Sequence, residues 1–163
     1  MEKKIAVLAG DGIGPEVIKQ GKKALNAIAS RFGHKFTYCH ADVGAIAIDN
    51  TGDPLPEATL ATCIEADAIL FGAIGDPKYD NNPDAKVRPE QGLLRLRKSL
   101  GLFCNIRPVA THPNLLHLSP LKPKNIGGVD MVIYRELTSG IYFGEKYLSE
   151  DGMSAFDKCE YHV

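Results

Sequence analysis

The first hundred residues alternate between short apolar runs and amphipathic stretches. Residues 4–9 form an almost continuous apolar run, which is typical of a strand buried on both faces of a sheet. Pro15 then opens a predicted helix that extends to Phe32, with Gly33 as its C-cap. Its apolar residues recur at helical spacing and predict one core-facing stripe, formed by Val17, Ile18, Leu25, Ile28 and Phe32.

The same alternation continues to about residue 100. The pattern predicts a strand at 36–43, a helix that follows 53–56 and runs to about residue 66, and a strand at 67–72. Pro89 marks the first turn of a third helix that runs to about Ser99, and Glu90 suits the positive end of its dipole. This order of strands and helices predicts an α/β unit with a largely parallel sheet.

The pattern changes after about Gly101 to short strands and loops. Predicted strands occupy 102–108, 129–136 and 141–144, with a turn at 137–140. We therefore expect a domain boundary here, with residues 1–101 in one domain and residues 102–163 in another.

Composition narrows the class of protein. Nineteen Lys and Arg face twenty Asp and Glu, so the net charge of −1 offers no general field for a nucleic acid or an anionic membrane. No apolar run approaches the ~18 residues that cross a bilayer, and no secretory segment opens the chain, so we expect a cytoplasmic protein. The four cysteines are far apart, which predicts reduced, mostly buried thiols and no disulfide or zinc framework.

A glycine-rich loop follows the first predicted strand. Gly10, Gly12 and Gly14 precede Pro15 and Glu16, so the G-x-G-x-x-G spacing of a Rossmann dinucleotide site fails. Glu16 would also compete with a pyrophosphate for the amides at the start of the helix. A tight turn that simply needs glycine is as good an interpretation of this loop as a ligand role.

The third predicted helix carries a mixed face. Residues 90, 93, 94 and 97 fall at helical spacing, so the carboxylate of Glu90, two leucines and the guanidinium of Arg97 share one side. One interpretation is a binding face, and the other is a helix with buried leucines and an ion pair at its edge. The remaining cations lie off this side and are expected to be solvated, namely Arg95 and Lys98.

Two further arginines stand at strand ends near the predicted boundary. Arg107 is pinned by Pro108, and Arg135 ends an apolar strand, with Tyr142 seven residues further on in the next predicted strand. A single arginine at such a position more often forms a surface ion pair than a binding site. Three arginines with a tyrosine that can donate a proton suit a small substrate with two anionic groups. The polar loop at 75–88 is also long enough to suggest function.

Four segments make the chain similar to a known family. Residues 8–17 (LAGDGIGPEV) resemble the opening signature of the β-decarboxylating hydroxyacid dehydrogenases, the isocitrate/isopropylmalate dehydrogenase family. Residues 92–98 (GLLRLRK), 105–108 (NIRP) and 135–144 (RELTSGIYFG) resemble its isopropylmalate branch, in order and over essentially the whole chain. The resemblance implies a two-domain α/β fold of which these residues are the N-terminal part.

The resemblance also implies a reaction. That branch of the family oxidises the C2 hydroxyl of an isopropyl-substituted malate with NAD and then decarboxylates the product, in leucine biosynthesis. Arg97, Arg107 and Arg135 match its clamp for the carboxylates of a dicarboxylate substrate. Tyr142 matches the acid that protonates the enol. The residues that contact the cofactor in that branch match Ile13, Gly75, Asp76, Pro77, Lys78 and Glu90.

Two leucines bear on the choice of substrate. Leu93 and Leu94 match the pocket for the isopropyl group, where each buried methyl contributes ~0.8 kcal/mol. Isocitrate dehydrogenases place polar residues on this helix, and Leu94 would leave the third carboxylate of isocitrate desolvated and unpaired. D-malate or tartrate dehydrogenase stays an alternative, because it needs only a smaller or more polar pocket.

The family polypeptide is longer than this chain. Its catalytic lysine and the aspartates that bind Mg²⁺ or Mn²⁺ match positions beyond Val163, so the resemblance implies no metal ligand here and no activity for the chain by itself. Residues 1–101 match the cofactor-side domain and 102–163 the substrate-side domain, whose arm at 141–158 helps a homodimer form. The alternative is a non-catalytic anion-binding or interaction module. Neither interpretation calls for nucleic acid or membrane.

Overall fold

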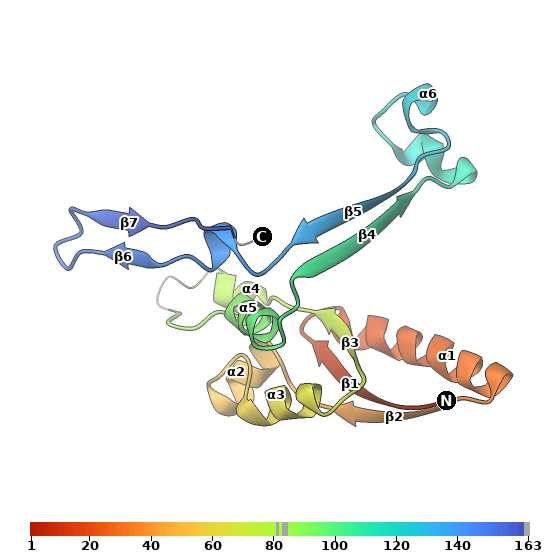
Figure 1. Cartoon of the computed structure of the whole chain (residues 1–163), viewed down its shortest axis with the longest axis horizontal. Coiled ribbons are helices and arrows are strands. Elements are labelled where there is room, and N and C mark those ends of the chain that lie inside the picture. The colour runs from red at the N-terminus through yellow and green to blue at the C-terminus, as the bar shows by residue number, and fades with distance from the viewer. Residues whose placement is uncertain (81, 83–84, 162–163) are drawn as a thin grey trace. The chain divides into compact units, whose positions relative to one another are not determined.

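The computed structural model describes residues 1–80, 82 and 85–161. They form two compact units, Met1–Leu100 (unit 1) and Gly101–Val163 (unit 2), and each is described by itself. Figure 1 shows the elements of both units along the chain. The division falls between Leu100 and Gly101.

Unit 1 is built on a three-stranded parallel sheet. Its strands are β1 (Glu2–Gly10), β2 (Lys35–His40) and β3 (Ala68–Ala73), in the order β2-β1-β3. The central strand pairs in parallel with both neighbours, with Glu2 opposite Lys35 and Ile5 opposite Ala68. Parallel strands need crossover connections, which are helical here. The α/β class and the parallel sheet expected from the sequence are thereby confirmed.

Helices cover both faces of this sheet (Figure 1). On one face lies α1 (Gly14–Phe32), which ends at Gly33, whose φ of 65° makes it the left-handed C-cap expected from the sequence. The opposite face is covered by α2 (Ala45–Thr51), α3 (Glu57–Ile64) and α5 (Pro89–Ser99). The short helix α4 (Pro77–Asp80) lies in the polar loop. The periodicity missed α2, because seven residues are too few to show it.

The side chains of β1 are buried on both faces of the sheet. Ile5 and Val7 pack with Ile18 of α1. The intervening Ala6 and Leu8 point to the opposite face, as the two-residue period of a strand requires. There they form a larger cluster with Val43, Leu55, Cys63 and Leu96. This second cluster fixes α3 and α5 to the sheet.

Less of the apolar stripe of α1 is buried than the spacing predicts. Only Ile18 is buried, whereas Val17, Ile28 and Phe32 are between 46% and 63% exposed. Gly21 faces Leu70 of β3, where a Cβ would make an ordinary contact at 3.7 Å. The helix therefore meets the three-stranded sheet along one narrow line, and its flanking apolar residues lie outside that contact.

Unit 2 consists of two antiparallel ribbons. One joins β4 (Cys104–Ala110) to β5 (Asp130–Glu136), and the other joins β6 (Lys146–Leu148) to β7 (Ala155–Asp157). Between the strands lie the helical turns η1 (Pro113–Leu118), α6 (Pro123–Ile126) and η2 (Gly140–Tyr142). Every side chain of β5 is exposed. A two-stranded ribbon with so little core is marginally stable alone.

The strand predicted at 141–144 is wrong. Residues 140–142 form the 3₁₀ turn η2, and the hairpin strand begins only at Lys146. Gly140 has a φ of 75°, and a Cβ there would lie 2.9 Å from the hydroxyl oxygen of Tyr161. Its N–H also donates to the carbonyl of Glu160 at 2.7 Å. This packing against residues 160–161 overrides the strand propensity of the local sequence.

No disulfide joins any of the four cysteines, all of which lie in the described part of the chain. Cys63 is buried, and burial raises the pKa of its thiol. Cys39 and Cys104 are half-buried and Cys159 is exposed. The expected burial of most thiols therefore applies to Cys63 alone.

Gly92 in α5 and Gly21 in α1 form a matched pair for a test of helix packing. A Cβ at Gly92 would lie 2.5 Å from the carbonyl oxygen of Pro54, whereas one at Gly21 would meet Leu70 at an ordinary 3.7 Å. We expect G92A to lower the free energy of unfolding by ~1–3 kcal/mol through overpacking. G21A should raise it by ~0.5–1 kcal/mol through helix propensity. Urea unfolding followed by circular dichroism measures both, and equal effects would contradict the close docking of α5.

Candidate active site

The helix α5 separates a core side from a site side. Pro89, Gly92 and Leu96 are its buried residues. Leu93, Leu94 and Arg97 are half-buried and Glu90 is exposed, so the side chains proposed from the sequence avoid the core. The N-terminus of the helix is capped locally, because Arg88 N–H donates to Gln91 Oε1 at 3.1 Å. Leu96 is the fully buried leucine of this helix, whereas Leu93 and Leu94 are only half-buried.

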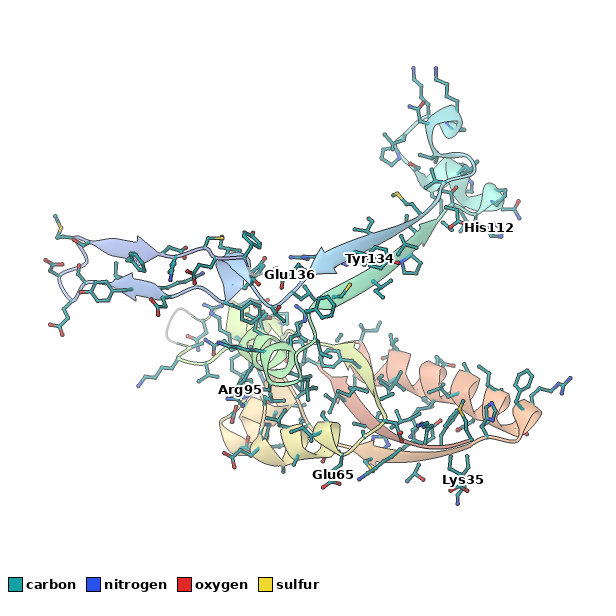
Figure 2. The ribbon with its side chains drawn as sticks, viewed as in Figure 1. Lys35, Glu65, Arg95, His112, Tyr134 and Glu136 are labelled. Atoms are coloured by element: carbon teal, nitrogen blue, oxygen red, sulfur yellow. The ribbon has the colours of Figure 1, made fainter. Side chains whose placement is uncertain are left out.

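Two contacts fix α5 against residues 53–55. Gly92 allows the close approach of the helix to Pro54. Arg95 donates to Asp53 Oδ1 at 2.6 Å and also to the carbonyl of Leu55. Figure 2 shows Arg95 on α5. The expectation that Arg95 is only solvated is wrong, because its guanidinium tethers the helix that presents Leu93, Leu94 and Arg97.

Asp11, directly after β1, is a buried carboxylate that joins three segments of unit 1. Its Oδ2 accepts from the N–H of Ala45 at 2.8 Å and from that of Gly75 at 3.0 Å, and its Oδ1 accepts from Ile46 at 3.0 Å. Gly44 has a φ of 83°, and a Cβ there would lie 2.3 Å from the carboxylate. Asp11 thereby caps the N-terminus of α2 and also fixes the chain that follows β3.

The residues matched to cofactor contacts gather after the carboxyl ends of β1 and β3. A Cβ on Gly75, whose φ is 125°, would lie 3.4 Å from Glu90 Oε1. Ile13 is the N-cap of α1 and is 63% exposed, and a Cβ on its neighbour Gly12 would lie 4.0 Å from the Gly75 carbonyl oxygen. Open α/β sheets bind ligands at this edge.

The remaining residues of this set lie in α4 or, in the case of Asp76, directly before it. Asp76 Oδ1 accepts from the N–H of Lys78 at 3.0 Å, and Lys78 Nζ forms an ion pair with Asp49 of α2. Tyr79 donates its hydroxyl to the same carboxylate at 2.8 Å. These donors lower the pKa of Asp49, Lys78 first, and the ion pair raises the pKa of Lys78. The Lys78 ammonium is therefore paired with Asp49 in this structure, and its expected contact with the cofactor stays a prediction.

The ribbon of β4 and β5 brings Arg107 and Arg135 to one face. Arg135 lies opposite Asn105, and Arg107 follows Asn105 by two residues on the same strand. Side chains two apart share a face, so the arginines are diagonal neighbours across the ribbon. Arg107 Nε donates to Asn105 Oδ1 at 3.0 Å, which orients its guanidinium. Two guanidinium groups on one face can bind a carboxylate in a bidentate manner.

Tyr142 lies in η2 and is 59% exposed. The turn that leads to it is organised by Glu136 at the end of β5 (Figure 2). That carboxylate accepts from the N–H of Thr138 at 2.5 Å, from its hydroxyl at 2.6 Å and from the N–H of Ser139 at 3.2 Å. These bonds, with those from Thr138 the largest, lower the pKa of Glu136. The position of Tyr142 is therefore set by a charged turn and not by a strand.

No group of three or more His, Cys, Asp or Glu side chains that could hold a metal ion occurs among residues 1–80, 82 and 85–161. The described residues therefore provide no such ligand set for a divalent metal ion. In the same part of the chain no helix is both long and apolar enough to span a bilayer.

The sequence patterns missed Asp11 and Asp49 as determinants of this site. Asp11 lies between two glycines of a predicted turn, and the helix that it caps begins 34 residues later, so no local signal identifies the cap. Asp49 carried no signal, because its partners lie 29 and 30 residues away.

Open α/β sheets bind ligands at the edge described for unit 1, and paired arginines such as those of unit 2 suit carboxylate groups. The chain belongs to the isocitrate/isopropylmalate dehydrogenase family, whose model matches residues 4–163. Members of this family are decarboxylating dehydrogenases, so the class inferred from the motifs is confirmed.

Curated relatives sharpen the comparison. The chain is 57% identical over 161 residues to 3-isopropylmalate dehydrogenase from Bacteroides fragilis, covering 99% of this chain and 45% of the relative. The enzyme of the same name from Rhodopirellula baltica is 49% identical over 165 residues, covering 100% and 46%. The chain therefore spans about half the length of these relatives, which agrees with a two-domain fold present here in part.

Solved structures agree on the fold. Isocitrate dehydrogenase from Methylococcus capsulatus superposes with a TM-score of 0.74 at 24% identity, over 98% of this chain and 42% of that chain. A β-decarboxylating dehydrogenase from Thermococcus kodakarensis gives 0.61 at 31% identity, over 95% and 39%. The first likeness concerns fold alone.

The turn at Glu136 gives a test of this site by pH. Because the folded pKa of Glu136 lies below its ordinary value of 4.5, its bonds stabilise the turn above that value and are lost as the pH falls through the folded pKa. We expect the amide NMR signals of Thr138 and Ser139 to titrate with a midpoint below pH 4.5. E136Q should abolish this titration and E150Q should leave it. A midpoint at or above 4.5 would contradict the assigned bonds.

Proposed function

We propose that this chain is part of an NAD-dependent 3-isopropylmalate dehydrogenase. The enzyme oxidatively decarboxylates (2R,3S)-3-isopropylmalate to 4-methyl-2-oxopentanoate in leucine biosynthesis. The observation that carries the proposal is the half-buried site side of α5, where Leu93 and Leu94 accompany Arg97 outside the core. The relatives that share 49–57% of their residues with this chain and carry that name support it.

The proposed roles follow from the chemistry of the side chains. Arg97, Arg107 and Arg135 bind the two carboxylates of the substrate. Leu93 and Leu94 surround its isopropyl group and exclude water. A bound NAD would supply the hydride acceptor for C2, and the proton of the C2 hydroxyl would leave to solvent. The bond from C3 to its carboxyl group then breaks with loss of carbon dioxide.

Tyr142 completes the reaction by giving its phenolic proton to C3 of the resulting enol. Ile13, Gly75, Asp76, Pro77 and Glu90 form the cofactor side of the site in this proposal. A requirement for Mg²⁺ or Mn²⁺ is also proposed, with ligands outside this chain, so the chain alone is expected to be inactive. The complete enzyme is proposed to be a cytoplasmic homodimer, with residues 141–158 as its dimerisation arm and no nucleic-acid or membrane partner.

Substrate preference tests the proposal. Residues 1–163 are joined to the remaining segment of the Bacteroides fragilis relative, and NADH formation is followed with Mg²⁺ or Mn²⁺ present. Three extra buried carbons at ~0.8 kcal/mol each give 3-isopropylmalate a kcat/KM ~10–100-fold above that of D-malate. Isocitrate should be poorer still, because Leu94 cannot pair with its third carboxylate. A preference for either competitor, or an inactive fusion, would overturn the proposal.

Tyr142 can be tested in the same fusion. Y142F removes the proton donor and keeps the ring, so we expect kcat for decarboxylation to fall ~10²–10⁴-fold, the range of general acid catalysis. The KM for 3-isopropylmalate should change little. Y147F, in β6, is the matched control and should behave as the parent. Equal losses in substrate binding and turnover would remove the proposed role.

A further inference from the structure

The segment at 75–79 is held to one helix at both of its ends. At its first residue, the N–H of Gly75 donates to Asp11 at 3.0 Å, and the same carboxylate caps the first turn of α2 through Ala45 and Ile46. At its other end, Lys78 and Tyr79 both contact Asp49, which lies one turn further along α2. Two carboxylates thus join one seven-residue helix to one loop segment.

Further bonds make the second end a defined turn. The N–H of Tyr79 donates to the carbonyl of Asp76 at 2.9 Å, and Asp76 Oδ1 accepts from Lys78. The Tyr79 carbonyl accepts from the guanidinium of Arg88 at 3.3 Å. Tyr79 is therefore held through its hydroxyl, its amide and its carbonyl. These bonds define the backbone turn of 76–79, and Asp49 contributes to it through the side chains of Lys78 and Tyr79.

The ion pair contributes little to global stability. The side chains of Lys78 and Asp49 are 47% and 42% exposed, and pairs at this exposure are screened by solvent. Its effect is instead local, because it orders a segment with few buried apolar contacts. It also holds the Lys78 ammonium against Asp49, next to the residues at 75–77 that are proposed to contact the cofactor.

We propose that Asp49 and Lys78 are positioning residues which, together with Asp11, fix the segment at 75–79 on α2 in the arrangement that receives NAD. The inference rests on the proposed function and deepens it. Asp49 contacts neither substrate nor cofactor in this account. It acts through Lys78 and Tyr79, and its loss lowers the affinity for NAD and leaves the chemistry unchanged.

Hydrogen exchange in the 163-residue chain tests the first half of the proposal. D49N keeps the size of the side chain and removes its charge. Losing an ion pair and part of a hydrogen bond should speed exchange of amides 78–80 by about threefold to tenfold. D49E should restore most of the protection. D42N is the matched control, because Asp42 accepts from Asn50 of α2 at 2.9 Å but is not bonded to 75–79. Equal exchange in D49N and D42N would overturn the proposal.

Kinetics in the fusion enzyme test the second half. D49N should raise the KM for NAD about threefold to tenfold, change kcat less than about twofold and leave the KM for 3-isopropylmalate unchanged. Y79F, which removes only the hydroxyl, should act in the same direction and guards against misfolding of D49N. An unchanged KM for NAD in an active enzyme overturns the positioning role alone, as does a fall in kcat with no change in KM. An inactive parent fusion overturns the proposed function and this role with it.

Discussion

The arrangement of unit 1 depends on the buried carboxylate of Asp11. A carboxylate removed from water must be met by donors, and three backbone amides from two distant segments do this. The sheet, the start of α2 and the loop after β3 are consequently fixed to one point. Gly44 is needed beside it because any Cβ would collide with the carboxylate oxygen. The edge of the sheet at the carboxyl ends of β1 and β3 takes its shape from this contact.

The helix α5 shows how one element serves both core and site. Its buried side, Pro89, Gly92 and Leu96, packs against residues 53–55 and the cluster around β1. Arg95 strengthens that docking from the edge. Leu93 and Leu94 are only half-buried and lie outside that packing. The substrate role proposed for them therefore does not compete with the contacts that fix the helix.

In unit 2, too, the residues that set the geometry differ from those proposed to bind the substrate. The hydrogen bonds of the ribbon place Arg107 and Arg135 on one face, and Glu136 shapes the turn that carries Tyr142. Asn105 orients Arg107 from the neighbouring position on its own strand. Charged side chains thus set the geometry in a unit that has little apolar core. The roles of the two units as cofactor side and substrate side stay predictions.

The sequence by itself determined the strands and the long helices of unit 1, the Gly33 cap and the family, because apolar periodicity and motif spacing are local properties. It also singled out Leu93, Leu94, Arg97, Arg107 and Arg135. Only the tertiary structure decided what distant contacts control. Asp11 caps α2, Arg95 fixes α5 to residues 53–55, and Asp49 forms an ion pair with Lys78. Packing against residues 160–161 makes 140–142 a 3₁₀ turn and not a strand. The sequence could not show these contacts because the partners lie far apart along the chain.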